Sequence, residues 1–214
     1  MRFSGFEYQL MHVEHQLFFT KLTTPYSQEE ILSELKKESW VPFGQTNTVG
    51  LDDDHWAKRF KVLRAESPLL QRIQSFIFDQ DTRASVVDAL YQSSPNIRNI
   101  YGMEKDFMIA NTLLHGEFTW DRPGFACGRH IDFRLLAATG GTYFTDHDDE
   151  RLATHFYRDN KSDSPAFARA TTEFGSGWMQ VNDIDVWHDG WNNSDQDRYS
   201  MLTALTLQLK NPAF

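Results

Sequence analysis

The chain has 214 residues, of which 40% are hydrophobic and 24% charged, and its formal net charge is −9. This length and composition are typical of a globular protein with an ordinary hydrophobic core, and we expect a single domain over residues 1–214. A strongly acidic chain lacks the positive field that attracts phosphate backbones. Nucleic acid is therefore not expected as a partner.

Cysteine content and the N-terminal residues indicate the compartment. The only cysteine is Cys127, so no internal disulfide can form, and a reducing environment is expected. The first residues lack the apolar stretch of a signal peptide, and no apolar run reaches the roughly 20 residues of a membrane helix. These features predict a soluble cytoplasmic protein without a membrane partner.

The N-terminal part, about residues 1–100, is expected to be mainly helical after one or two opening strands within residues 6–22. Ser27 and Glu30 have the spacing of a capping box, which predicts a helix that ends near Glu38. Ser67-Pro68 predicts the start of a second helix, because serine caps helices and proline suits their first turn. A third helix is expected to begin at Thr82 and to end at Ser93.

The C-terminal part, about residues 105–210, is expected to form a sheet-based core. Short β-forming segments follow one another here, separated by clusters of Gly, Asp, Asn and Ser, and such a pattern predicts a sandwich or barrel. The fold class is therefore α+β. The predicted strands are 107–110, 113–114, 117–120, 135–144, 151–157, 177–181, 184–187 and 198–209.

His130-x-Asp132 is the first candidate site, at what the pattern indicates is the start of a strand. Side chains two residues apart in a strand point to the same face. One imidazole and one carboxylate on a face form two thirds of a 2-His-1-carboxylate metal site. His188 is the candidate for the second histidine.

Arg198-x-Ser200 follows ten residues later, and period 2 again places both side chains on one face. The segment Asn192–Gln196 is a cluster of turn-forming residues. If the turn centres on Asn193, residues 188 and 198 lie opposite each other on paired antiparallel strands. Arg198 would then lie about 4.8 Å from the strand that carries the metal ligand.

Other residues leave open alternatives. His147-x-Asp149 is a second pair of the same kind, but it lies in a polar cluster that indicates a hairpin loop. His155 either lines a substrate pocket or packs, and Arg134 either faces substrate or forms a surface salt bridge. The same choice, between an aromatic substrate wall and core packing, applies to Trp120, Trp178, Trp187 and Trp191.

The order of these motifs resembles that of the Fe(II)/2-oxoglutarate-dependent oxygenases, in particular the branch of prolyl hydroxylases and related small oxygenases. The motifs are Pro123-Gly124, Gly128-x-His130-x-Asp132, Trp187-His188 and Arg198-x-Ser200. The resemblance implies a double-stranded β-helix, the jelly-roll core of cupins, with the N-terminal helices packed on one sheet. It covers about residues 105–210.

The resemblance also implies a cofactor. His130, Asp132 and His188 would be ligands of Fe(II), leaving three positions for 2-oxoglutarate and O₂. Oxidative decarboxylation of 2-oxoglutarate to succinate and CO₂ would accompany hydroxylation of a C–H bond. Asp132 argues against the halogenating variants of the family, which lack this carboxylate.

Three further residues are implied in binding the cosubstrate. Arg198 would bind the distal carboxylate of 2-oxoglutarate, because a guanidinium group can pair with a carboxylate through two parallel hydrogen bonds. Ser200 would add a hydroxyl donor, and Tyr143 lies on the strand where some members place a tyrosine that contacts the same carboxylate.

The expected substrate is a small molecule, an amino acid or a side chain of a peptide or protein. Two alternatives to the hydroxylase stay open at this point. One is a cupin-like metalloenzyme that does not use 2-oxoglutarate, and the other is a β-barrel binding module without catalysis. Arg198→Ala separates the first alternative from the hydroxylase, and iron binding separates the second.

Overall fold

The computed structural model describes residues 3–14, 16–43, 57–62, 64–93, 102–132, 136–182 and 186–208. Within these ranges no helix combines the length and hydropathy of a membrane span. The helices are α1 (Gln28–Leu35), α3 (Pro68–Phe78), α4 (Gln80–Ser93) and α6 (Lys105–Asn111), with one 3₁₀ turn, η1 (Glu150–Leu152).

The strands form two antiparallel sheets. The larger has eight strands in the order β1 (Glu7–Glu14), β2 (Leu17–Thr23), β10 (Ser176–Val181), β7 (Leu136–Tyr143), β12 (Arg198–Leu207), β5 (Thr112–Asp121), β4 (Arg59–Lys61) and β3 (Val41–Pro42). The smaller has four strands in the order β6 (Ala126–His130), β11 (Trp187–Trp191), β8 (Thr154–Tyr157) and β9 (Ala168–Arg169).

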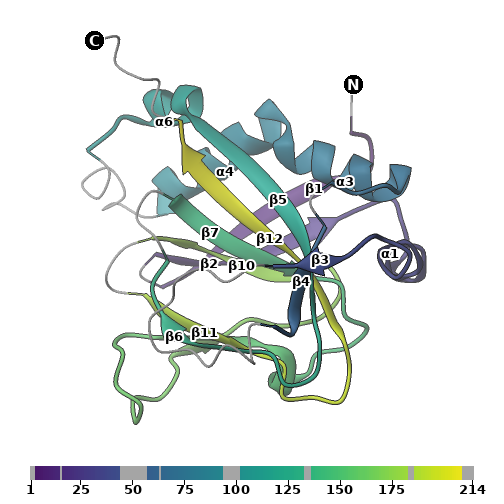
Figure 1. The fold of residues 1–214 in the computed structure, drawn as a ribbon. Helices are drawn as coiled ribbons and strands as arrows, with labels where there is room; N and C mark the ends of the chain where they lie inside the picture. The colour runs from purple at the N-terminus through teal and green to yellow at the C-terminus, as the bar shows by residue number, and fades with distance from the viewer. Residues whose placement is uncertain are drawn as a thin grey trace, which may run out of the picture.

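The arrangement in space confirms the predicted fold class. Figure 1 shows α3 and α4 along one face of the large sheet, with β6 and β11 on the opposite side. The chain passes repeatedly between the sheets, so strands next to each other in the large sheet, such as β7 and β12, are far apart in sequence. This is an α+β fold with a double-stranded β-helix, or jelly-roll, core and helices on one sheet.

Alternation along β12 separates the core from the cavity. Tyr199, Met201 and Leu205 belong to the hydrophobic core between the large sheet and the helices. Arg198, Ser200, Leu202 and Ala204 line a cavity on the other side. The predicted period of 2 is thus confirmed for Arg198 and Ser200, which lie on the same face.

Two of the three predicted helix starts are confirmed, and the third lies two residues earlier, because α4 begins at Gln80 and not at Thr82. Ser27 and Glu30 form the reciprocal hydrogen bonds of a capping box at α1. Ser67 is the N-cap residue of α3, but its side chain forms no capping bond. The carboxylate of Glu38 lies beside this end of the helix, where it accepts hydrogen bonds from the backbone N–H groups of Ser67 and of Glu66, which precedes it. A carboxylate also suits the positive end of the helix dipole.

Several predicted strands need correction. Residues 107–110 belong to helix α6, not to a strand. The segment predicted over 151–157 begins with the 3₁₀ turn η1, and its strand starts at Thr154. The strand predicted over 184–187 starts at Trp187 and continues to Trp191, while residues 183–185 lie outside the described residues.

Gly177 permits the close approach of β10 to β7, the strand that carries Thr139 and Tyr143. A Cβ atom at Gly177 would lie 1.9 Å from the backbone oxygen of Gly141, which cannot move without breaking the ladder. We expect Gly177→Ala to lower the free energy of unfolding by at least about 2 kcal/mol, measured by chemical denaturation.

Gly116→Ala is the matched control, since Gly116 also lies within a strand of the large sheet. Its Cβ would meet the flexible side chain of Met201, with Sδ at 2.9 Å, rather than backbone. A loss below about 1 kcal/mol is expected there, because the methionine side chain can move aside. Equal losses in the two variants would contradict this account.

Candidate active site

The two sheets enclose a cavity of about 640 Å³. The small sheet contributes Cys127, His130 and His188 to its lining, and the large sheet contributes side chains of β5, β7, β10 and β12. Such a volume is ordinary for a small-molecule site.

His130 is the last residue of β6. The prediction that the pair His130-x-Asp132 lies at the start of a strand is therefore wrong, because the pair lies at the end of one. Its Nδ1 atom lies 2.7 Å from the backbone oxygen of Gly128, a distance at which Nδ1–H donates to that carbonyl. This bond leaves Nε2 without a proton in the neutral ring and so fixes it as the possible ligand atom. Nε2 lies 3.5 Å from Oδ1 of Asp132.

His188 reaches the same point from the neighbouring strand. It lies on β11, directly opposite His130 in the β6–β11 ladder, and is buried. The two rings lie with their centroids 4.3 Å apart. Nε2 of His188 lies 3.6 Å from Oδ2 of Asp132.

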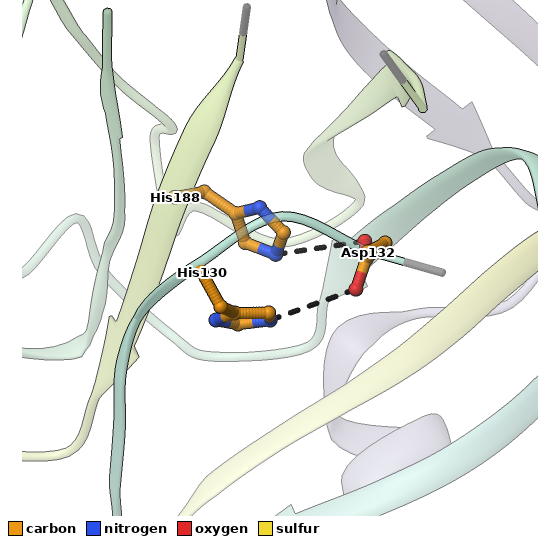
Figure 2. Close-up of side chains that lie close together, drawn as sticks. All are labelled: His130, Asp132 and His188. Atoms are coloured by element: carbon orange, nitrogen blue, oxygen red, sulfur yellow. Dashed lines mark ion pairs between the residues drawn. The ribbon is translucent and has the colours of Figure 1, made fainter. Parts of the chain in front are cut away.

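Asp132 completes the group. Its side chain accepts a hydrogen bond from the hydroxyl group of Thr139 on β7, and the oxygen of that hydroxyl also lies 2.9 Å from Oδ1 of Asn182. Figure 2 shows both imidazole rings turned toward this carboxylate. One ligand atom from each of the three residues lies within 4.8 Å of the others, so the group could hold one metal ion.

The charges of the three groups depend on one another. Burial by itself would lower the pKa of His130, but Asp132 and Cys127 raise it to about 11. Burial lowers the pKa of His188 to about 4, so this ring is neutral. Burial would raise the pKa of Asp132, yet both histidines outweigh it and lower that pKa well below its usual range. A metal ion would therefore take the place of a proton between His130 and Asp132.

Gln180 is the hydrogen-bond partner of the His188 ring on the side away from Asp132. Its amide nitrogen lies 3.1 Å from Nδ1 of His188, and its Oε1 is buried without a hydrogen-bond partner. A metal on Nε2 places the ring proton on Nδ1, which then needs an acceptor. Rotating the amide by half a turn brings Oε1 to Nδ1–H as its acceptor, and the NH2 group then takes the position that Oε1 leaves. The residues fit a metal with this one rotation.

We expect Gln180→Leu to weaken metal binding by about 10- to 100-fold, because the ring of His188 loses the acceptor that orients it. Titration of the metal-free protein with Ni(II) by calorimetry would measure this. Gln16→Leu is the control, since Gln16 is also buried with an unpartnered Oε1 but, unlike Gln180, is not hydrogen-bonded to His188. Wild-type affinity in Gln180→Leu would remove this glutamine from the site.

Arg198 does not lie where the predicted hairpin would have put it. His188 belongs to the small sheet and Arg198 to the large sheet, so the strands of these two residues are not paired. The segment Asn192–Gln196 is a crossover between the sheets, with buried Asn192 donating to the backbone oxygens of Asp121 and Gln196 at 2.8 Å. Arg198 instead lies opposite Asp121 of β5.

The guanidinium group of Arg198 is almost fully engaged. Nε and Nη2 donate to Oδ2 of Asp121 at 3.0 and 2.6 Å. Nη1 donates to the backbone oxygens of Leu152 and, at 2.9 Å, Trp191. Since a guanidinium has five N–H bonds, these four contacts leave one on Nη2.

Hydroxyl groups line the cavity near Arg198. Oγ of Ser200 lies 2.8 Å from Oγ1 of Thr119. Tyr143 donates its hydroxyl proton to Oγ1 of Thr154 at 2.8 Å. A Cβ atom on Gly190 would lie 3.9 Å from both Nη2 of Arg198 and Oγ1 of Thr154, so the missing side chain leaves space beside these polar groups.

The remaining candidates are divided. His147 is on the surface, where it pairs with Asp146 and Asp149. His155 does not line the cavity, and its Nδ1 lies 3.4 Å from Oδ1 of Asp189. Trp178 lines the cavity, whereas Trp120 stacks on Tyr199 on the helix side. Arg134 lies outside the described residues.

Sequence reasoning missed Gln180, Asp121 and Arg59. Asp121 lies one residue beyond the predicted strand 117–120, but it ends β5, whose alternation places it on the face of Glu117 and Thr119. Arg59 lies in the short alternating stretch Lys58–Lys61, which could have been interpreted as a strand. Nothing in the sequence indicated its partner.

The fold and the converging groups define a double-stranded β-helix with a candidate 2-His-1-carboxylate site. No protein-family model matches the chain, and no curated protein matches its sequence. Solved structures do match. HygX from Streptomyces hygroscopicus, crystallised with nickel and 2-oxoglutarate, is 12% identical, with 91% of this chain and 84% of that chain covered and a TM-score of 0.54.

A second match is a prolyl hydroxylase from Trichoplax adhaerens in complex with a peptide fragment of the oxygen degradation domain of hypoxia inducible factor. It is 12% identical, with 83% of this chain and 75% of that chain covered and a TM-score of 0.51. At these identities the likeness is one of fold. The chain therefore shares its fold with these two structures.

Proposed function

We propose that this protein is a non-haem Fe(II)/2-oxoglutarate-dependent oxygenase that hydroxylates a C–H bond of a small molecule, an amino acid or a peptide side chain. The observation that carries the proposal is the convergence of His130, Asp132 and His188 on a cavity that a buried arginine, Arg198, also lines. The likeness in fold to structures that hold nickel with 2-oxoglutarate, or a peptide, supports it.

His130, Asp132 and His188 would hold Fe(II) on one face and leave the other positions open. The bound iron and 2-oxoglutarate supply the activation of O₂, with release of succinate and CO₂. Two neutral imidazoles and one carboxylate give a ferrous site a net charge near +1, which attracts a dianionic cosubstrate. Thr139 and Gln180 would hold the ligands in place.

Arg198 would bind the distal carboxylate of 2-oxoglutarate through the remaining N–H of Nη2, with Ser200 and Tyr143 nearby in the cavity lining. Asp121 would orient the guanidinium group, because its carboxylate accepts hydrogen bonds from Nε–H and from the other N–H of Nη2. Arg198 would thus bind the distal carboxylate of 2-oxoglutarate through Nη2 alone, and not through the two parallel hydrogen bonds expected from the sequence.

The test is an anaerobic titration of the metal-free protein with Fe(II) and then 2-oxoglutarate, followed by visible absorbance. A weak charge-transfer band that needs both components is expected, because 2-oxoglutarate would chelate an open ferrous site. Succinate formation that depends on both would then report turnover. Absence of iron binding would contradict the metal site and favour a non-catalytic binding module.

One observation favours a second candidate, a metalloenzyme of the same fold that does not use 2-oxoglutarate. Asp121 already occupies Nε and Nη2 of Arg198, the edge that would otherwise face a carboxylate. In that case iron would bind without the band, and 2-oxoglutarate would have no effect on the metal-loaded protein.

A further inference from the structure

Asp121 lies between two arginines on three adjacent strands. In the ladder of the large sheet it is the direct partner of Arg59 on β4 and of Arg198 on β12. Arg59 donates from Nε to Oδ1 at 2.6 Å and from Nη2 to Oδ2 at 2.8 Å. The side chain of Asp121 is fully buried, and both arginines line the cavity. Arg59, Asp121 and Arg198 are called the arginine triad below.

The charges of the arginine triad add up to +1. Burial by itself would raise the pKa of Asp121, but the two guanidinium groups outweigh it and lower that pKa, so the carboxylate is ionised at neutral pH. A buried carboxylate of this kind cancels one cation and not two. A cavity wall with one excess positive charge attracts an anion.

The other carboxylates that line the cavity, among the described residues, have different partners. Glu117 lies 3.6 Å from Nζ of Lys61. Asp132 belongs to the candidate metal site. Asp189 accepts a hydrogen bond from the hydroxyl of Tyr157 at 2.7 Å. Among the described residues, none of these three carboxylates forms a hydrogen bond or ion pair with Arg198, which pairs with Asp121.

We infer that Arg59 gives the anion subsite its net charge: it shares Asp121 with Arg198, and so leaves Arg198 able to attract the distal carboxylate of a dianionic 2-oxo acid. This inference rests on the proposed function. Without Arg59, Asp121 and Arg198 would form a neutral pair. Arg198 would still donate its four hydrogen bonds to Asp121, Leu152 and Trp191 within the protein. Arg59 is thus a positioning residue that acts through Asp121, and it selects a dicarboxylate over a monocarboxylate.

The experiment measures binding of 2-oxoglutarate to the Ni(II)-loaded protein by calorimetry. Pyruvate serves as the comparison, since it has the same 2-oxo acid group and lacks the distal carboxylate. Arg59→Met is expected to weaken 2-oxoglutarate binding at least about tenfold, as loss of one nearby charge in a poorly solvated site requires. Pyruvate binding should change less than about twofold.

Two further variants make the test specific. Lys61→Met removes a cation from the same face of the same strand, but that cation lies beside Glu117 and not Asp121. It should leave 2-oxoglutarate binding within about twofold of wild type. The double variant Arg59→Met with Asp121→Asn returns the net charge to +1, and it should recover most of the lost affinity, because the two sites act as one unit.

Thermal melting and Ni(II) affinity establish that each variant is folded with its metal site intact. Arg59→Gln, which keeps a hydrogen bond to Asp121 without the charge, replaces Arg59→Met if the latter does not fold, with the same expected loss. Wild-type affinity in the Arg59 variant, an equal loss for pyruvate, or no recovery in the double variant would each overturn the inference. If the wild-type protein itself does not bind 2-oxoglutarate, the proposed function fails instead.

Discussion

Replacing His130 with alanine is expected to reduce iron-dependent formation of succinate at least about a hundredfold. Among the described residues, His130 offers one of the three converging ligand atoms, and even groups that merely orient a ligand are worth 10- to 100-fold in metal affinity. Iron affinity measured anaerobically should fall with the activity. Removing the imidazole also takes away a partner of the Asp132 carboxylate.

His147→Ala is the matched control for this prediction. His147 has the same spacing to Asp149 that His130 has to Asp132, so the sequence alone offers both pairs. In the structure its side chain is 42% exposed and pairs with Asp146, away from the cavity. Wild-type activity is expected in this variant. Full activity in His130→Ala, or a loss of activity in His147→Ala, would contradict the assignment of the metal site to His130 and favour the pair His147 and Asp149.

Strand faces could be predicted from the sequence better than strand partners. Period 2 correctly placed Arg198 and Ser200 on one face, because alternation is a local property of extended backbone. Which strand lies next to β12 is decided by long-range packing. The segment Asn192–Gln196 has the composition of a hairpin turn, yet it crosses between sheets, since buried Asn192 bonds to the distant backbone oxygen of Asp121.

The helix α6 was mistaken for a strand for a related reason. Residues 107–110 form a short apolar run, and a run of that length is compatible with either structure. In the structure Met108 is buried while Phe107 stays 51% exposed, so only part of the run enters the core. Contact with α4 decides in favour of the helix.

The three residues of the proposed metal site illustrate how sequence and fold share the information. The spacing of His130 and Asp132 is short enough to be interpreted directly, and the fold adds His188 as the ladder partner of His130. Gln180, Arg59 and Asp121 carry no motif. They acquire a role only because Gln180 of β10 contacts His188 of β11 and because β5 lies between β4 and β12, and no local pattern encodes that placement.

Replacing Arg198 with methionine is expected to weaken 2-oxoglutarate binding at least about a hundredfold, with Ni(II) affinity unchanged, because the proposed contact to the distal carboxylate and its charge are both lost. Arg198→Lys keeps the charge but presents it as a single point. One ammonium group cannot serve Asp121 and the carbonyls of Leu152 and Trp191 together and also bind a ligand. A loss of about tenfold is expected for this variant.

Arg198→Met also lowers the free energy of unfolding, by about 2 to 4 kcal/mol, since the carbonyl groups of Leu152 and Trp191 lose a donor and Asp121 loses one of its two arginine partners. Binding should therefore be measured well below the melting temperature of each variant. Arg151→Met is the control: Arg151 is mostly exposed and pairs with Asp149. Wild-type affinity for 2-oxoglutarate in a folded, metal-binding Arg198→Met protein would contradict the cosubstrate site, and the metalloenzyme that does not use 2-oxoglutarate would then account better for the cavity.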